Sequence, residues 1–220
     1  MAPSQQPCWI WTPQPCPGQT QYVCLRRRFS LSAAPAAASV RLTADTRYEL
    51  YVNGQWLGHG PARSWPEPWP VDCYDLTGLL HEGENVIAVL VHHMERSSLQ
   101  YLPAPAGLWA ELTWREGRAT RRLTTDQDWR CRPHEGFAPR TPRISINQTW
   151  EEQFDARREP GEGWIQAAFD DSAWPQAQVL KNGRQPHKTF EPRDIPFLTR
   201  DRLQPARLVN IQAVRTAPYT

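Results

Sequence analysis

The stretch that decides the fold is residues 48–58, which read YELYVNGQWLG. Apolar side chains alternate with polar or amphipathic ones over residues 48–52, a pattern typical of a strand with one buried face. The Asn53-Gly54 pair that follows supplies the two positive-φ residues that a type I′ turn requires. Residues 55–58 then return as the partner strand. The stretch therefore predicts a two-stranded antiparallel hairpin.

Further short strands are predicted on both sides of this hairpin, at a spacing of about ten residues with turn signals between them. They cover residues 22–31, 39–44, 86–91, 108–114 and 118–124, with weaker candidates at 129–132, 144–146 and 208–214. The run VIAVLV at 86–91 is apolar on both faces and is expected in the core. Such a series is typical of an antiparallel sandwich. The predicted fold class is all-β, an antiparallel jelly-roll-like β-sandwich.

The alternation fades toward the C-terminal end of the chain. Residues 60–70 are interpreted as a loop because prolines interrupt them, and residues 169–174, FDDSAW, as a single capped helical turn. From residue 181 onward prolines and charges dominate. We expect one sandwich domain over residues 1–180 and an irregular connector over residues 181–220.

The composition is that of an ordinary globular protein. Of the 220 residues, 40% are hydrophobic and 22% are charged, and the formal net charge is +2. This balance argues against a disordered chain and gives no pull toward nucleic acid. The eight arginines of residues 115–143 are half offset by four acidic residues. No nucleic-acid motif accompanies them, so they are interpreted as a solvated hairpin face, and no nucleic-acid partner is expected.

The sequence shows neither a membrane span nor a targeting segment. Its best apolar run is far shorter than the ~20 residues that a membrane helix needs. Residues 1–15 lack a basic region followed by an apolar one. We therefore expect a cytoplasmic protein with no membrane partner. The five cysteines form no CxxC pair, and the adjacent His92 and His93 would point to opposite sides of a strand. No metal or other cofactor is predicted.

Two blocks of motifs in this sequence resemble a known family. The first block is FSL (29–31), SVRLTAD (39–45), YELYVNG (48–54), GPAR (60–63), YDLTGLL (74–80) and GENVIAVLV (83–91). The second block is EEQFDAR (151–157), GW (163–164) and FDDSAW (169–174). Together, and in this order, they resemble the N-terminal, galactose-binding-like β-sandwich of the bacterial alpha-L-rhamnosidases, over roughly residues 20–200.

The resemblance implies that catalysis belongs to a large helical barrel further along such proteins. The 220 residues contain no such barrel, so the family's catalytic acid and base have no positions here. No catalytic residue is predicted, and the chain alone is not expected to act as an enzyme. The partners implied are a rhamnoside-type carbohydrate and a glycosidase catalytic domain.

Three functions remain open from the sequence. The first is a non-catalytic, carbohydrate-associated accessory module that supports or extends a sugar site. The second is the N-terminal part of a glycosidase that is active only when joined to a catalytic domain. The third is a structural sandwich that docks a partner without binding sugar, in which case residues 197–220 would form the docking edge.

Two loops carry the candidate ligand-binding residues. Sugar binding needs a flat aromatic face for the C–H surface of a pyranose ring, together with donors and acceptors for its hydroxyl groups. The first loop carries Arg63, Trp65 and Trp69, and the second carries His92, His93, Glu95, Arg96 and Tyr101. If the sandwich brings the loops to one end, they form a shallow site. The alternative is that Trp65 and Trp69 pack on the sheet or against a neighbouring domain.

The densest acidic cluster, Glu151, Glu152 and Asp155, is not interpreted as a catalytic pair. A glycosidase needs two carboxyl groups about 5–9.5 Å apart that address one bond. Neighbouring residues of a strand face opposite sides, so Glu151 and Glu152 cannot both do so. Ion pairs with Arg157 or Arg158 and capping roles are expected instead.

Overall fold

The hairpin expected over residues 48–58 is present in the computed structural model, which describes residues 6–145, 147–181, 183–199 and 204–212. Asn53 and Gly54 form its turn, with φ of 49° and 83°. The Asn53 side chain donates to the Leu79 carbonyl at 2.9 Å and accepts from the Val86 amide at 2.9 Å. The turn is therefore tied to the strand beside it as well as to its own hairpin.

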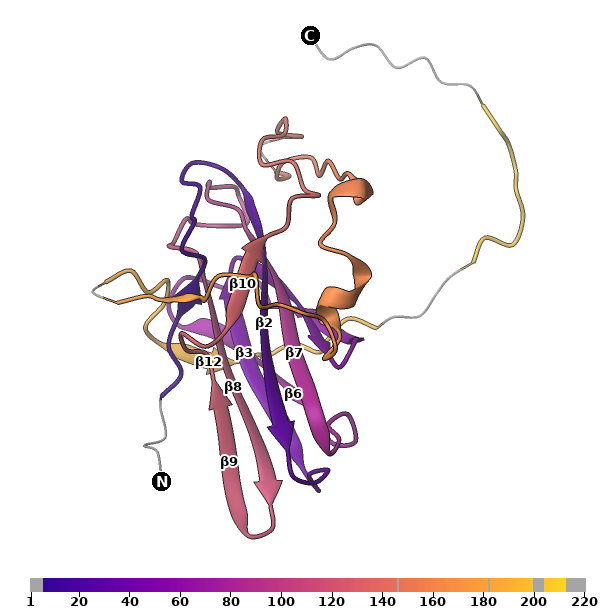
Figure 1. The fold of residues 1–220 in the computed structure, drawn as a ribbon. Helices are drawn as coiled ribbons and strands as arrows, with labels where there is room; N and C mark the ends of the chain where they lie inside the picture. Colours follow the sequence, from indigo (N-terminus) through magenta and orange to yellow (C-terminus); the bar gives the residue numbers. More distant parts are fainter. Residues whose placement is uncertain (1–5, 146, 182, 200–203, 213–220) are drawn as a thin grey trace.

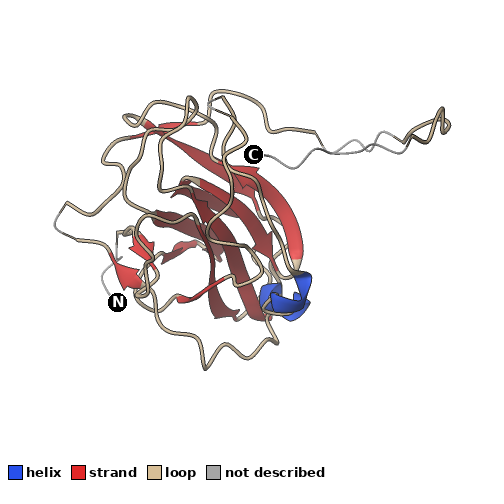
Figure 2. Ribbon diagram, turned by 90° about the horizontal axis from the view of Figure 1, so that it is seen from above, coloured by secondary structure: helices blue, strands red, loops and turns tan. Residues whose placement is uncertain are grey.

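Strands dominate the described residues (Figure 1), which confirms the all-β prediction. They are β1 (Ile10–Trp11), β2 (Gln21–Leu31), β3 (Ala38–Asp45), β4 (Arg47–Val52), β5 (Gln55–Gly60), β6 (Trp69–Asp75), β7 (Gly83–His93), β8 (Gly107–Glu116), β9 (Ala119–Thr124), β10 (Arg130–Pro133), β11 (Gln178–Val179) and β12 (Phe190–Pro192). Two short 3₁₀ helices, η1 (Ala156–Arg158) and η2 (Glu162–Ile165), complete the regular elements. Figure 2 shows these helical turns at the side of the strands.

The strands form two sheets that pack as a sandwich. One has the order β11-β1-β8-β3-β6-β12, with β9 paired to β8, and the other has the order β10-β2-β7-β4-β5. All pairings are antiparallel except that of β12 with β6, which is parallel. None of the described helices is long or apolar enough to cross a membrane.

The core lies between the facing sheets, where the alternating apolar side chains meet. Leu25, Leu50 and Val89 from one sheet are fully buried, as are Leu42 and Leu108 from the other. Burying one such side chain stabilises the fold by about 1.5–3 kcal/mol. The outer face of β7 is also covered, because Trp164 and Trp174 pack on Ala88 of this strand and on Cys24 of the neighbouring β2. This explains why the run VIAVLV is apolar on both faces.

Strand β6 was not predicted from the sequence. Residues 60–70 were expected to form a loop because of their prolines, and no strand was predicted for the residues of β6 that follow. In the structure, Asp72 is wholly buried within β6, where it accepts from Tyr48 and from Arg193. Its partners are distant in sequence, so no local pattern could reveal the strand.

Two weakly predicted strands are wrong where the structure describes them. Ile144 lies in an exposed loop, and Ile146 is outside the described residues. Residues 208–212 are not in a strand either, and residues 213–214 are outside the described residues. The expected helical turn over residues 169–174 is a simple turn, in which Asp170 accepts from the Ser172 amide at 2.9 Å.

The connector expected from residue 181 includes a strand, β12, that pairs with β6. Arg193 follows it and reaches the buried Asp72 at 3.1 Å. Packing on the sandwich therefore continues at least to Arg193, beyond the boundary expected at residue 180. This part of the connector was not visible in the sequence because a single aromatic residue, Phe190, which packs on Trp9 and Trp109, and one polar pair attach it, and neither forms an alternating pattern.

Candidate functional site

The two loops singled out in the sequence converge on one cleft of about 730 Å³. This main cleft is lined by residues 46–47, 61–66, 69, 94 and 98–102. Four of the eight candidate residues take part in it: Arg63, Trp65, Trp69 and Tyr101. Binding pockets for small molecules are typically about 300–1,000 Å³, so the volume is sufficient for a ligand.

The two tryptophans of the main cleft have different roles. Trp65 is 76% exposed and presents an open aromatic face. Trp69 is only 6% exposed and stacks on His187, with ring centroids 3.8 Å apart and planes within 4°. It begins β6 rather than lying in a loop, and it forms a wall of the cleft. The expectation that both tryptophans lie in one loop is thus wrong for Trp69.

The other four candidate residues do not line the main cleft. His93 is buried, and its ring nitrogens face Asp45 and Glu95, each at 3.0 Å. Arg96 donates to the Gly18 carbonyl at 2.9 Å. His92 stacks on Tyr22, with ring centroids 4.1 Å apart. These side chains hold the surrounding loops to the sandwich.

A buried carboxylate, Asp45, lies behind the main cleft and was not among the candidate residues. It accepts from the Tyr101 hydroxyl at 2.6 Å, from His93 Nδ1 at 3.0 Å and from His187 Nε2 at 3.1 Å. The second nitrogen of His187 faces the Pro66 carbonyl at 2.8 Å. Tyr101 and Pro66 both line the cleft, so this cluster fixes its inner wall.

The hydrogen bonds of this cluster determine the ionisation of Asp45. Burial alone raises the pKa of a carboxyl group, but the bonds from His187, His93 and Tyr101 outweigh it and hold the pKa of Asp45 below its ordinary value. Burial, together with the nearby Asp45 charge, raises the pKa of Tyr101. The Tyr101 hydroxyl therefore stays protonated and donates a hydrogen bond to the Asp45 carboxylate. The only local signal in the sequence was an aspartate at the end of a strand.

A second cleft, of about 420 Å³, adjoins the main cleft and shares Arg47 and Pro61 with it. This side cleft is lined by residues 22, 47–49, 59–61, 90, 92, 137 and 152. Two carboxylates, Glu49 and Glu152, face it. They accept from the Tyr51 and Tyr22 hydroxyls at 2.6 and 3.1 Å.

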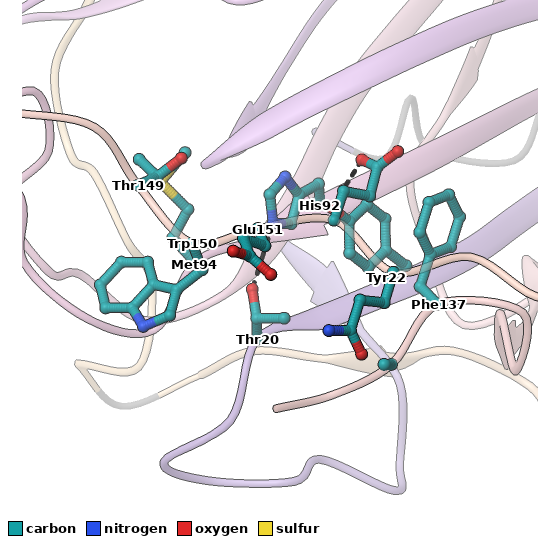
Figure 3. Close-up of a pocket in the computed structure, with 11 residues that line it drawn as sticks. Thr20, Tyr22, His92, Met94, Phe137, Thr149, Trp150 and Glu151 are labelled. Atoms are coloured by element: carbon teal, nitrogen blue, oxygen red, sulfur yellow. Dashed lines mark hydrogen bonds between the residues drawn. The ribbon is translucent and has the colours of Figure 1, made fainter. Parts of the chain in front are cut away.

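An aromatic stack fills the space beside the side cleft (Figure 3). Tyr22 lies between His92 and Phe137, with a ring-centroid distance of 3.7 Å to Phe137. The Thr20 hydroxyl is 3.1 Å from His92 Nε2. The free volume that remains here is about 20 Å³, which suits a water molecule rather than a sugar. Burial, and the nearby positive charge of Arg47, lower the pKa of His92 to about 3.

Two aspartates of the second motif block, Asp155 and Asp171, serve structural roles. Asp155 accepts from the Arg157 amide at 3.1 Å and pairs with its guanidinium at 2.8 Å, which confirms the expected cap and ion pair. Asp171 is buried and pairs with Arg26 and Arg28 of β2. The five cysteines are all free thiols.

Comparison with known proteins connects this architecture to one family. The family model described as "Alpha-L-rhamnosidase N-terminal domain" matches residues 33–196. An alpha-L-rhamnosidase of Streptomyces avermitilis is 25% identical over 180 residues, which are 78% of this chain and 14% of that protein. The crystal structure of a GH78 family rhamnosidase of Bacillus sp. GL1 superposes with a TM-score of 0.77 at 39% identity, covering 88% of this chain and 20% of that one.

The same sandwich occurs outside these hydrolases. A lectin of Pleurotus ostreatus, solved in complex with GalNAc, superposes with a TM-score of 0.55 at 20% identity, over 89% of this chain and 50% of the lectin. At that identity the likeness shows the fold alone. The chain thus spans only a small part of the rhamnosidases that it matches and half of the lectin.

Proposed function

The chain belongs to the family of alpha-L-rhamnosidase N-terminal domains, and on that premise we propose that it is a non-catalytic accessory module whose main cleft binds a carbohydrate. The observation that carries the proposal is the convergence of the two loops on one cleft, with the open face of Trp65 beside Arg63. An indole face packs on the C–H surface of a pyranose ring, and a guanidinium donates to its hydroxyl groups.

The inner wall of the cleft supports this proposal. Asp45 holds Tyr101 through its hydroxyl and holds Pro66 through His187. A site fixed in this way before the ligand arrives loses less conformational entropy on binding. The sandwich of a lectin solved with GalNAc has the same fold, which is consistent with a sugar site on such a scaffold.

We assign hydrolysis to a catalytic domain of the rhamnosidase type and not to the main cleft. Cleavage of a glycosidic bond requires two carboxyl groups flanking it, and the residues that line the main cleft include neither Asp nor Glu. The chain covers 14% and 20% of the two rhamnosidases named above. Within such a protein, the module would supply binding while another domain supplies catalysis.

A second candidate function is docking of a partner domain. Several large apolar side chains near the C-terminal end of the described residues are exposed: Phe197, Leu198, Leu208, Val209 and Ile211. Exposed apolar clusters mark interaction surfaces, and these side chains favour contact with a glycosidase catalytic domain. Trp65 would belong to the same interface if the main cleft bound no sugar.

Titration with rhamnose and rhamnose-containing oligosaccharides, followed by calorimetry and tryptophan fluorescence, tests the proposal. We expect saturable binding, weakened about tenfold or more in Trp65→Ala because an aromatic anchor is lost. Trp56→Ala, at a tryptophan that lines neither cleft, is the matched control and should bind as the wild type does. Flat isotherms and unchanged fluorescence with every saccharide would reject sugar binding and favour the docking function.

A further inference from the structure

The main cleft and the side cleft differ in the charge of the side chains that line them. Two cationic residues, Arg47 and Arg63, line the main cleft, and no carboxylate does. The side cleft shares Arg47 but also contains Glu49 and Glu152. The main cleft therefore differs from the adjoining side cleft in having no carboxylate among its lining residues.

Neither arginine of the main cleft is neutralised by its surroundings. No described carboxylate forms an ion pair with Arg47 or Arg63. Most arginines near the sheets are paired, for example Arg26 and Arg28 with Asp171. An arginine without a partner at a cleft has its charge available for a ligand.

Arg63 is also held in position by the opposite loop. Its Nη2 donates to the Leu99 carbonyl at 3.0 Å, which joins the 61–66 segment to the 98–102 segment. A guanidinium has five N–H donors in a rigid plane, so this bond orients the group and leaves the other donors unused by described residues. That geometry suits a planar, bidentate acceptor such as a carboxylate.

The carboxylate behind the main cleft, Asp45, is not among the groups that a ligand in the cleft would contact. Asp45 is wholly buried, and three donors, Tyr101, His93 and His187, already satisfy it. Tyr101 stands between Asp45 and the cleft that it lines. The surface that a ligand meets is therefore aromatic and cationic.

We propose, on the basis of the carbohydrate-binding function above, that the main cleft selects an acidic saccharide. Its carboxylate would pair with Arg63, with Arg47 adding attraction from β4, while a sugar ring lies on Trp65. The ligand class is thus an oligosaccharide that contains a uronic acid, rather than a neutral rhamnoside alone.

A matched pair of disaccharides tests the proposal. Rhamnose linked to galacturonic acid is compared by calorimetry with the same disaccharide after reduction of its carboxyl group to the primary alcohol. We expect the acidic form to bind about tenfold tighter at low salt, with the preference shrinking as ionic strength rises. Arg63→Gln should weaken the acidic form about tenfold more than the neutral form, so that the preference disappears, and Arg63→Lys should restore only part of it because lysine lacks the planar fork.

The control and the contrary outcomes separate this inference from the proposed function. Arg118→Gln, at the exposed turn between β8 and β9, removes one positive charge outside both clefts and should keep the full preference. Equal affinity for the two disaccharides would overturn the acidic ligand and leave sugar binding intact. A preference that persists in Arg63→Gln would also overturn it. Binding of neither disaccharide would contradict sugar binding itself.

Discussion

Residues 10–133 and residues 134–197 are attached to the same sandwich in different ways. The first region contains ten of the strands, and the buried apolar faces of its sheets hold it together. The second region crosses both sheets mostly as loops. Three polar pairs, here called the anchor pairs, tie it to the first region: Arg26 with Asp171, Asp45 with His187, and Asp72 with Arg193.

The difference shows where single substitutions should do most harm. In the first region, the stabilisation is spread over many apolar contacts, each of them modest. In the second region, fewer apolar side chains, such as Trp164 and Trp174, pack on the sheets, and a few buried polar groups that are costly to leave without a partner carry more of the attachment. Removing one member of a buried ion pair leaves the other charge buried without a counter-ion. Replacing both members by apolar residues is often tolerated.

The largest effect is expected at the Arg26–Asp171 anchor pair. The Arg26 side chain is wholly buried, and it also donates to the Gln166 and Phe169 carbonyls at 2.8 and 3.2 Å. Asp171→Ala leaves this guanidinium buried without its counter-ion, and we expect unfolding free energy to fall by about 3–5 kcal/mol. Urea denaturation followed by tryptophan fluorescence measures the loss, since Trp164 and Trp174 pack beside the pair.

Two further variants complete this test. Asp128→Ala removes the partner of Arg27 in a partly exposed pair and should cost under about 1 kcal/mol. The double variant Arg26→Met and Asp171→Leu should recover most of the stability that Asp171→Ala loses. Equal losses in Asp171→Ala and Asp128→Ala would show that the second region does not depend on its buried anchor.

The same contrast explains what the sequence could predict. The hairpin of β4 and β5, the long strand β7 and the β8–β9 hairpin follow from alternation and turn residues, which are local signals. Asp45, Asp72 and Asp171 gave no such signal, because each is satisfied by partners tens of residues away along the chain. Buried polar pairs of this kind become visible only in three dimensions.

The candidate site was also predicted only in part, because residue type is a local signal and side-chain direction is not. Arg63, Trp65, Trp69 and Tyr101 were found because aromatic and planar polar side chains gather in two loops, and the sandwich brings those loops together. His93 and Glu95 come from the same stretch of sequence, but His93 faces inward toward Asp45 and Glu95 accepts from the amide of Gly18. Sequence distinguishes residue types well, but the direction of a side chain at the end of a strand depends on how the loops pack.

A smaller effect is expected at the turn of the β4–β5 hairpin in the first region. Asn53 adopts a left-handed conformation with φ of 49°, and its side chain bonds to Leu79 and Val86. Asn53→Ala adds backbone strain and removes these two bonds and a third, to the Asn85 side chain at 2.8 Å, and we expect a loss of about 1–3 kcal/mol. Thermal or urea unfolding would measure it.

Asn53→Gly separates the two causes. Glycine accepts the left-handed conformation without strain but cannot make the side-chain bonds. Its loss should therefore be smaller than that of Asn53→Ala. Should the two variants prove equally unstable, the side-chain bonds alone, and not the backbone conformation, would account for the role of Asn53.

The smallest effect concerns acid, and it arises where the two regions meet at the stack of His92, Tyr22 and Phe137. The pKa of His92 is about 3 in the folded protein, against an ordinary value of 6.5. Between these pH values His92 is protonated in the unfolded chain but not in the folded protein. The free energy of unfolding therefore falls as the pH is lowered from about 6.5 toward 3. Because His92 is not wholly shielded from water, we expect a loss on the order of 1 kcal/mol at pH 5. Asp45, whose pKa is lowered by its hydrogen bonds, adds a further loss only below about pH 4.

Urea midpoints of the wild type and of His92→Gln, measured from pH 7 to pH 4.5, isolate the contribution of the histidine, because glutamine does not titrate. The slope with pH is compared rather than the absolute stability, since glutamine also loses the stack on Tyr22. Parallel profiles would mean that His92 is protonated as easily in the folded protein as in the unfolded chain, and that acid does not act through this contact between the regions.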